Sequence, residues 1–186
     1  VNHSLGVAPE MMWIKTRSGS NNWAAISVTM GLAYRLESDV KFYSSMYDIW
    51  TNSTAPTTNV ITLGSEGTVN YSGTTYIAYL FASLDGVSKV GSYTGNGSNQ
   101  NIACGFSAGA RFVLIKRTDS TGDWYIWDTE RGIVSGNDPH LSLNSTAAEV
   151  TSDDSIDPES SGFTVNQVSA TNINESSATY IFLAIA

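Results

Sequence analysis

Short apolar runs divided by polar turns set the pattern of this chain. Met11–Thr16 and Phe112–Lys116 are rich in residues that favour strands, and each is followed by a cluster of turn-forming residues such as Ser, Gly, Asn or Asp. The chain then returns through Trp23–Met30 and Trp124–Thr129, and each return begins with a tryptophan. The pattern predicts two β-hairpins of similar construction.

Two more runs, Tyr76–Ala82 and Tyr180–Ala186, are apolar almost throughout. Strands that are buried on both faces have continuous apolar sequences, so we expect both runs to be central strands of a sheet. Helix-like spacing of apolar residues occurs in Asp39–Trp50 and predicts a short helical excursion there. Four prolines and turn signals at near-regular intervals favour an all-β fold, either a β-sandwich or a jelly-roll-like arrangement.

Comparison of the chain with itself reveals an internal repeat. Ile14 and Ile115 lie in similar segments that are 115 − 14 = 101 positions apart, and Trp23 and Trp124 keep the same offset. A match at a fixed offset identifies the structural unit independently of any assignment of strands. The sequence therefore predicts two diverged tandem copies of one unit, with a pseudo-two-fold relation between them.

Two further blocks extend this repeat along the chain. Val69–Ala78 corresponds to Ile173–Phe182 at an offset of 173 − 69 = 104, and Leu36–Ser38 corresponds more weakly to Leu143–Ser145. The unequal offsets indicate small insertions in loops. The predicted organisation is a first repeat unit, a connecting segment with the lead-in strand of the second unit, and a second repeat unit, at residues 1–82, 83–104 and 105–186.

The repeat also predicts what lies beside the first copy. By the offset of 101, Ile102 corresponds to Val1, so the first copy lacks the strand and Gly-rich turn that precede the second copy. A missing strand would leave a sheet edge bare. We therefore expect either further residues before Val1 or a strand supplied by a neighbouring subunit beside Met11–Thr16.

Composition and charge exclude several classes of protein. Nine basic and 17 acidic residues give a net charge of −8 without a clustered basic patch, which argues against nucleic-acid binding. The one cysteine, Cys104, permits neither an internal disulfide nor a thiolate metal site. No apolar run is long enough to span a membrane, so we expect no membrane insertion.

Residues suited to catalysis are few. The two histidines, His3 and His140, lie in loop-like sequence and no nucleophile elbow is present, so a catalytic triad is disfavoured. Most acidic residues of the second half fall in Thr151–Ser161, which we interpret as a solvated loop, and its alternating oxygen donors match a calcium loop only weakly. We expect no catalytic residues, no metal and no cofactor.

Four motifs resemble the lectin-like repeat domains of marine bacteriophage tail-fibre and structural proteins. They are Lys116–Asp119, Trp127–Gly132, Leu143–Glu149 and Ile173–Ile181. The resemblance implies a concanavalin-like β-sandwich on a virion assembled in the host cytoplasm, which attaches to the host surface and acts as a receptor-binding, non-enzymatic domain. It also implies other virion proteins, and a glycan of the host cell surface, as partners.

The resemblance leaves alternatives open. The first half departs from the motif, because Ile26-Ser27 and Met30-Gly31 stand where the second half has Trp127-Asp128 and Arg131-Gly132. A capsid or tail decoration protein is one alternative. A glycan depolymerase that uses Asp128 and a partner acid is another, since Asp128 is the acid that adjoins aromatic residues. For a fibre we expect a homo-oligomer, with a trimer as the first guess.

Aromatic side chains supply the binding hypothesis, because exposed Trp and Tyr rings stack on sugars. Aromatic residues that recur in both copies are expected in the core, so the non-repeated ones are the candidates, with packing or subunit contacts as the alternative. These aromatics are Tyr43, Tyr47, Trp50, Tyr93 and Trp127. The candidate ligand-binding residues are Tyr47, Trp50, Tyr93, Trp127, Asp128 and Arg131.

Overall fold

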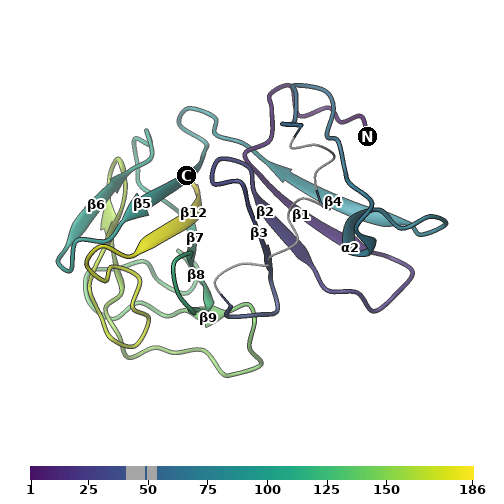
Figure 1. Ribbon diagram of the computed structural model, residues 1–186. Coiled ribbons are helices and arrows are strands. Elements are labelled where there is room, and N and C mark those ends of the chain that lie inside the picture. The colour runs from purple at the N-terminus through teal and green to yellow at the C-terminus, as the bar shows by residue number, and fades with distance from the viewer. Residues whose placement is uncertain (41–48, 50–53) are drawn as a thin grey trace. The chain divides into compact units, whose positions relative to one another are not determined.

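The computed structural model describes residues 1–40, 49 and 54–186, and this part of the chain is nearly all β (Figure 1). It divides into two units. The first contains Val1–Glu37 and the chain up to Ala82, and the second contains Ser83–Ala186 together with a short segment that begins at Ser38. The all-β class predicted from the sequence is confirmed. The predicted helical excursion lies largely outside the described residues.

The first unit is built on one antiparallel sheet with the strand order β3-β2-β1-β4. Its elements are β1 (Met11–Thr16), β2 (Ala24–Ser27), β3 (Leu32–Arg35), β4 (Tyr76–Phe81) and the short helix α2 (Gly67–Asn70). One face of the sheet, with Met12 and Ile26, packs against Ile61 and Val69 to form the core of this unit. The predicted hairpin is therefore present, as β1 and β2.

The second unit contains two sheets. A five-stranded sheet has the order β5-β12-β7-β8-β9, and a three-stranded sheet has the order β10-β11-β6. The strands are β5 (Ser88–Thr94), β6 (Gln100–Ala103), β7 (Phe112–Arg117), β8 (Trp124–Asp128), β9 (Leu141–Ser142), β10 (Ile156–Glu159), β11 (Gly162–Val165) and β12 (Thr179–Ile185). All the strand pairs are antiparallel.

Side chains from both sheets fill one core in the second unit. Phe163 of the three-stranded sheet meets Phe182 of the five-stranded sheet edge-on, with ring centroids 5.4 Å apart. Ile115, Trp127 and Val165 belong to the same buried cluster. The unit is thus β-sandwich-like, because two sheets bury facing apolar surfaces against each other.

Strands at corresponding positions in the two units pair in the same register. The central strands β1 and β7 each pair with the next strand in sequence on one side and with the last strand of their unit on the other. Met12 pairs with Ile26 in the first unit, as Val113 does with Trp127 in the second. Ile14 pairs with Ala78, as Ile115 does with Phe182. Ala24 pairs with Arg35, as Tyr125 does with Ser142. The offsets of 101 and 104 seen in the sequence therefore hold in strand pairing, and the third pair adds an offset of 142 − 35 = 107, which is that of the weaker block at Leu36–Ser38.

The prediction that both long apolar runs are central strands is right for one and wrong for the other. β12 lies between β5 and β7, and five successive residues of it are buried. β4 is an edge strand, and its residues are exposed or half-buried. Apolar composition does not separate the two cases, because the neighbour that covers β12 comes from a distant part of the chain.

The predicted position of the lead-in strand is also wrong. In the second unit the lead-in strand is β5, and it pairs with β12, not with β7. Among the described strands of the first unit, the corresponding edge therefore lies along β4, not beside Met11–Thr16. Among the repeated core positions, Ile14, Ile115, Trp124 and Tyr180 are buried, while Trp23 and Tyr76 are half-buried.

Candidate functional site

The acidic and basic candidates from the sequence meet on the surface of the second unit. Asp128 is the last residue of β8, and its carboxylate accepts a hydrogen bond from the backbone N–H of Arg131 at 2.9 Å and forms an ion pair with the Arg131 guanidinium. Nε of Arg131 lies 3.0 Å from a carboxylate oxygen of Glu149. One guanidinium therefore holds two carboxylates.

The aromatic candidates do not join this cluster as exposed rings. Trp127 is fully buried in the core. Tyr93 stacks on Tyr180 with ring centroids 4.8 Å apart, and its hydroxyl donates to the carbonyl oxygen of Ile173 at 2.6 Å. Neither side chain offers a ring face to a sugar in this conformation. The remaining three aromatic candidates, Tyr43, Tyr47 and Trp50, lie outside the described residues.

A buried polar cluster in the second unit was not predicted from the sequence. His140 is 3% exposed, and its Nδ1 lies 3.4 Å from a carboxylate oxygen of Asp153 without hydrogen-bond geometry. The same oxygen accepts from the hydroxyl of Ser155 at 2.9 Å, and that hydroxyl lies 2.8 Å from the hydroxyl of Thr171. The His140 ring also packs against Trp127, at 5.4 Å between centroids.

This arrangement lacks the geometry of a hydrolytic triad. In a triad the histidine lies between the nucleophile and the acid, whereas here Asp153 lies between Ser155 and His140. Ser155 is fully buried, so no substrate reaches its hydroxyl. The cluster instead fixes the loops around β9 and β10.

Asp138 adds a buried carboxyl to this region. It is 0% exposed and accepts hydrogen bonds from the backbone N–H groups of Val134 at 3.0 Å and Ile156 at 3.2 Å. Burial raises the pKa of Asp138 to about 7, the two N–H bonds oppose the rise, and the nearby charges of Asp154 and Asp157 add to it. The group is therefore poised between its two protonation states near neutral pH.

The expectation of a solvated loop at Thr151–Ser161 is wrong for much of that segment. Asp153, Ser155 and Ile156 are buried, and the segment contains the strand β10. A signal in the sequence was the turn-like Glu159–Gly162, which joins two strands.

The weak match to a calcium loop has a different structural outcome. The carboxylates of Asp154 and Asp157 each accept a hydrogen bond from the side-chain amide of Asn166, both at 2.8 Å. Within the described residues, no group of three or more His, Cys, Asp or Glu side chains is placed to hold a metal ion.

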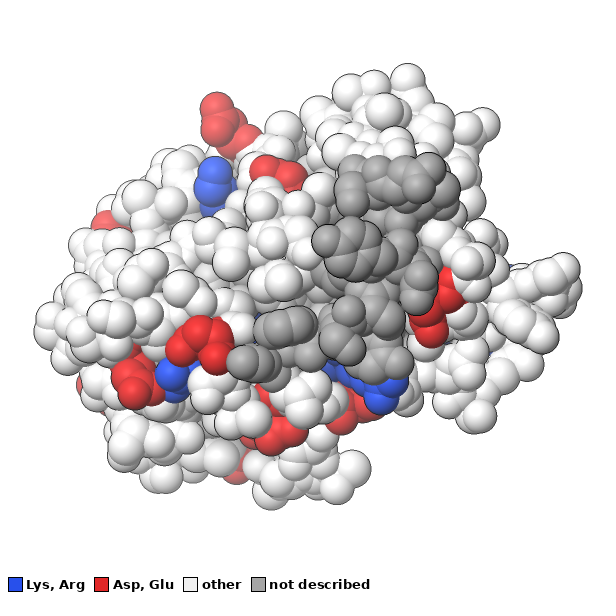
Figure 2. All heavy atoms as spheres, in the orientation of Figure 1, with Lys and Arg blue, Asp and Glu red and all other residues white. Residues whose placement is uncertain are grey.

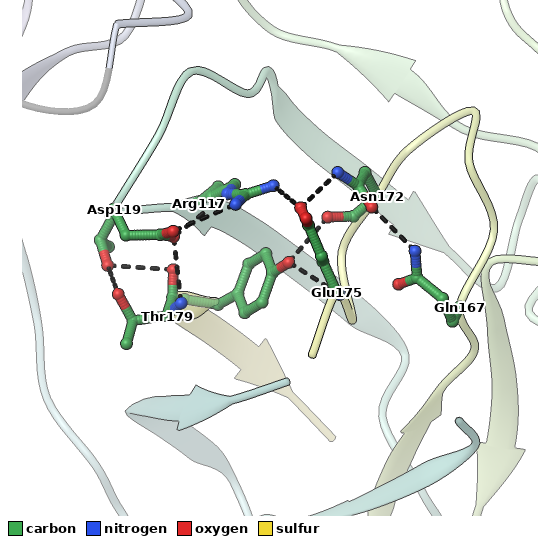
Figure 3. Close-up of polar contacts among 8 residues, drawn as sticks. Arg117, Asp119, Gln167, Asn172, Glu175 and Thr179 are labelled. Atoms are coloured by element: carbon green, nitrogen blue, oxygen red, sulfur yellow. Dashed lines mark hydrogen bonds and ion pairs between the residues drawn. The ribbon is translucent and has the colours of Figure 1, made fainter. Parts of the chain in front are cut away.

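A second ion-pair network closes the end of the five-stranded sheet (Figure 3). The Arg117 guanidinium makes two hydrogen bonds to Asp119, at 3.1 and 3.0 Å, and reaches Glu175 in the loop before β12. Partial burial acts to raise the pKa of Asp119, but hydrogen bonds from Arg117 and the Thr179 backbone hold it below its usual range. Hydrogen bonds from Arg117 and Asn172 likewise lower the pKa of Glu175. The network ties the turn after β7 to the start of β12.

Charged residues make up only 14% of the chain. On the face drawn in Figure 2, Lys and Arg side chains are scattered singly among uncharged atoms and do not gather into a patch. That nucleic acid is not a partner stays a prediction, which rests on the net charge of −8. In the part of the chain that the structure describes, none of the helices has the length and apolar character needed to cross a bilayer.

These features define an all-β, β-sandwich-like class of protein. In the described residues, the polar side chains of each cluster bond mainly to one another and to nearby backbone groups. The chain belongs to the family described as "Domain of unknown function (DUF7483)", whose model matches residues 1–186. Comparison with curated proteins and with solved structures found no match.

Proposed function

We propose that the two units are diverged tandem copies of one unit, as the sequence repeat predicts. Bonds outside the strand ladders support this in addition to the shared register. In both units a lysine of the central strand donates to a carbonyl oxygen of the following turn, as Lys15 does to Asn21 and Lys116 to Gly122. A tyrosine hydroxyl of the last strand accepts from the backbone N–H five residues earlier, from Tyr71 to Tyr76 and from Glu175 to Tyr180. The backbone N–H of the hairpin tryptophan donates to a side-chain oxygen, from Trp23 to Glu37 and from Trp124 to Asn144.

We propose further that the chain is a non-enzymatic structural protein of a bacteriophage virion and serves in a tail fibre as a receptor-binding domain for a host-surface glycan. The sequence resemblance is the basis of this proposal. The structural observation that supports it is the position of the motif residues. Those described below hold strands and turns together and do not line a cleft, as expected for a scaffold that presents loops to a partner.

The first motif, Lys116–Asp119, shows this scaffold role. Lys116 is fully buried, and its ammonium donates to the carbonyl oxygens of Asp39 at 2.8 Å and Gly122 at 2.5 Å. Burial lowers the pKa of Lys116 to about 8, while the charges of Asp39 and Asp123 oppose that change. The lysine therefore anchors a turn.

The third and fourth motifs act in the same way. Asn144 accepts a hydrogen bond from the N–H of Trp124 at 2.8 Å and donates to Asp123 at 2.7 Å. Asn174 is fully buried and donates to backbone carbonyl oxygens, including that of Ser98. The loops that these residues hold in place would then determine which receptor is bound.

The location of the chain in the particle is the first test. An antibody against the purified protein should label the tail fibres of phage particles that encode it. Labelling of the capsid shell would favour the decoration-protein alternative. Particles that carry no label, although the gene is expressed during infection, would contradict a role in the virion.

The depolymerase alternative has one observation in its favour, because Arg131 brings the carboxylates of Asp128 and Glu149 to one place. The two acids of a glycosidase must face the bond that is cleaved, however, and here both carboxylates are engaged by the same guanidinium. We expect purified protein to release no new reducing ends from host polysaccharide. Sustained release that is lost in Asp128→Asn but kept in Glu130→Gln, a neighbouring exposed acid, would show that the chain is an enzyme.

A further inference from the structure

β4 (Tyr76–Phe81) lies at the edge of its sheet, so the backbone groups on its outer side have no strand partner among the described residues. On the inner side, Arg17 N–H donates to the carbonyl of Thr75 at 2.8 Å, in register with the β1–β4 ladder. In an antiparallel pair such bonds alternate along the strand, so the odd-numbered residues of β4 bond to β1. Tyr76, Ala78 and Leu80 therefore direct their N–H and C=O groups outward. In the described part of the chain, no strand pairs with this side of β4.

In the second unit, the strand that corresponds to β4 is β12, and its outer edge is paired with another strand. At the corresponding edge of β12, the outward residues pair with β5 in antiparallel register. These pairs are Tyr180 with Tyr93, Phe182 with Gly91 and Ala184 with Lys89. Since 182 − 78 = 104, Ala78 occupies the position of Phe182. The outer edge of β4 therefore has the geometry to accept one more antiparallel strand.

β4 also lacks the features that normally protect an edge. Exposed edges usually carry a charged residue, a proline or a bulge, because an unprotected edge pairs with other chains. The edge strand β5 carries Lys89 and the edge strand β10 carries Pro158. β4 has neither a charge nor a proline, and its Ile77 and Tyr79 are 39% and 46% exposed.

We propose that the occupant of this edge is β4 of a second copy of the chain, paired antiparallel about a two-fold axis at Ala78. In the second unit a glycine is required opposite Phe182, since a Cβ at Gly91 would lie 2.6 Å from the Phe182 ring. With alanine in place of that phenylalanine, the opposing residue has room for a small side chain. Ala78 fits against the partner's Ala78, and Tyr76 then faces the partner's Leu80.

Charge and symmetry favour this occupant over others. Each copy carries a net charge of −8, but the seam would consist of uncharged residues only, so like charges are not brought together there. The β5 strand of a second copy pairs with its own β12 on one side and carries Lys89, a charge that protects its outer edge, so it is a poorer partner for β4. Pairing of an edge with itself is isologous and closes at two copies, so it predicts a dimer, not an open chain or a trimer.

The oligomeric state in solution tests the proposal. Sedimentation velocity of the purified chain should show a species of twice the chain mass. Ala78→Pro removes an N–H that points outward and takes no part in the β1 ladder, so we expect dimerisation to weaken about 10- to 100-fold. Ala78→Val keeps the N–H and is the matched control, and it should remain dimeric.

Amide exchange of the wild-type chain provides a readout that needs no variant. In the dimer the amides of Tyr76, Ala78 and Leu80 should be protected, and they should lose protection on dilution. Those of Ile77 and Tyr79 bond to β1 and should stay protected throughout. A monomer at all concentrations, a trimer, or a dimer that persists in folded Ala78→Pro would each overturn the proposal, whichever other strand or protein proves to bind the edge.

Discussion

Removal of Tyr180–Ala186 should abolish folding of the second unit. β12 is hydrogen-bonded on both sides, to β5 and β7, and Tyr180, Ile181, Phe182 and Leu183 are at most 3% exposed. Burial of a large apolar side chain contributes about 1.5–3 kcal/mol, so these four side chains contribute about 6–12 kcal/mol, comparable with the whole stability of a typical domain. The deletion also leaves buried peptide groups of two neighbouring strands without partners.

Amide exchange of β7 would measure this loss, because β7 lies at the centre of the sheet that β12 completes. A chain that lacks only Ala186 is the control. It loses the single hydrogen bond from Ala186 N–H to the carbonyl of Val87, 2.9 Å long, and should keep nearly the protection of the full chain. Cooperative unfolding and protected β7 amides after deletion of the whole strand would contradict the central placement of β12.

The buried carboxyl of Asp138 should make the second unit less stable as the pH rises from about 4 to about 7. Its pKa is raised from 3.8 to about 7, mainly by burial, so the folded chain binds this proton more tightly than the unfolded chain does. The favourable contribution is complete below the unfolded pKa and is lost as the pH passes through the folded pKa. A difference of this size corresponds to up to about 4 kcal/mol.

The comparison with Asp138→Asn isolates this contribution, because the variant cannot titrate at that position. Asp119 and Glu175 have lowered pKa values and act in the opposite direction, so the free energy of unfolding of the wild type alone would mix these effects. The difference between wild type and Asp138→Asn should be largest near pH 4 and shrink towards pH 8. Asp85→Asn, at an exposed acid, is the control and should show no such trend. A difference that stays constant with pH would mean that Asp138 is not perturbed in the folded chain.

Both predictions concern the scaffold and do not depend on the proposed function. The two clusters described above, the ion pairs at Arg117 and the buried group around His140, serve mainly to join loops to strands. The proposed functions therefore rest on a displayed surface and on the β4 edge. If the dimer forms as proposed, each assembly would present two copies of every surface loop, which increases avidity for a repetitive receptor such as a glycan.

The amino-acid sequence by itself determined the hairpins. Met11–Thr16 has the same bounds in the prediction and in the structure, and Ile14 and Ile115 each lie in a strand that is paired on both sides. These features are local, because a short apolar run with a turn residue after it restricts the chain whatever the rest of the fold does. The departure of the first half from the Asp128 and Arg131 pattern was also visible in the sequence, and the structure brings these two side chains together.

Only the tertiary structure decided which residues are buried and which edges are open. Tyr76–Phe81 and Thr179–Ile185 are apolar alike, yet the first is an edge and the second a centre, because β5 reaches only the second. Trp127 was predicted to bind a ligand, and His140 was predicted to lie in a loop. Both side chains are buried in the structure. Burial of a polar or aromatic side chain depends on contacts between segments far apart in the chain. The pattern of apolar and polar residues within one segment does not identify the distant segments that cover it.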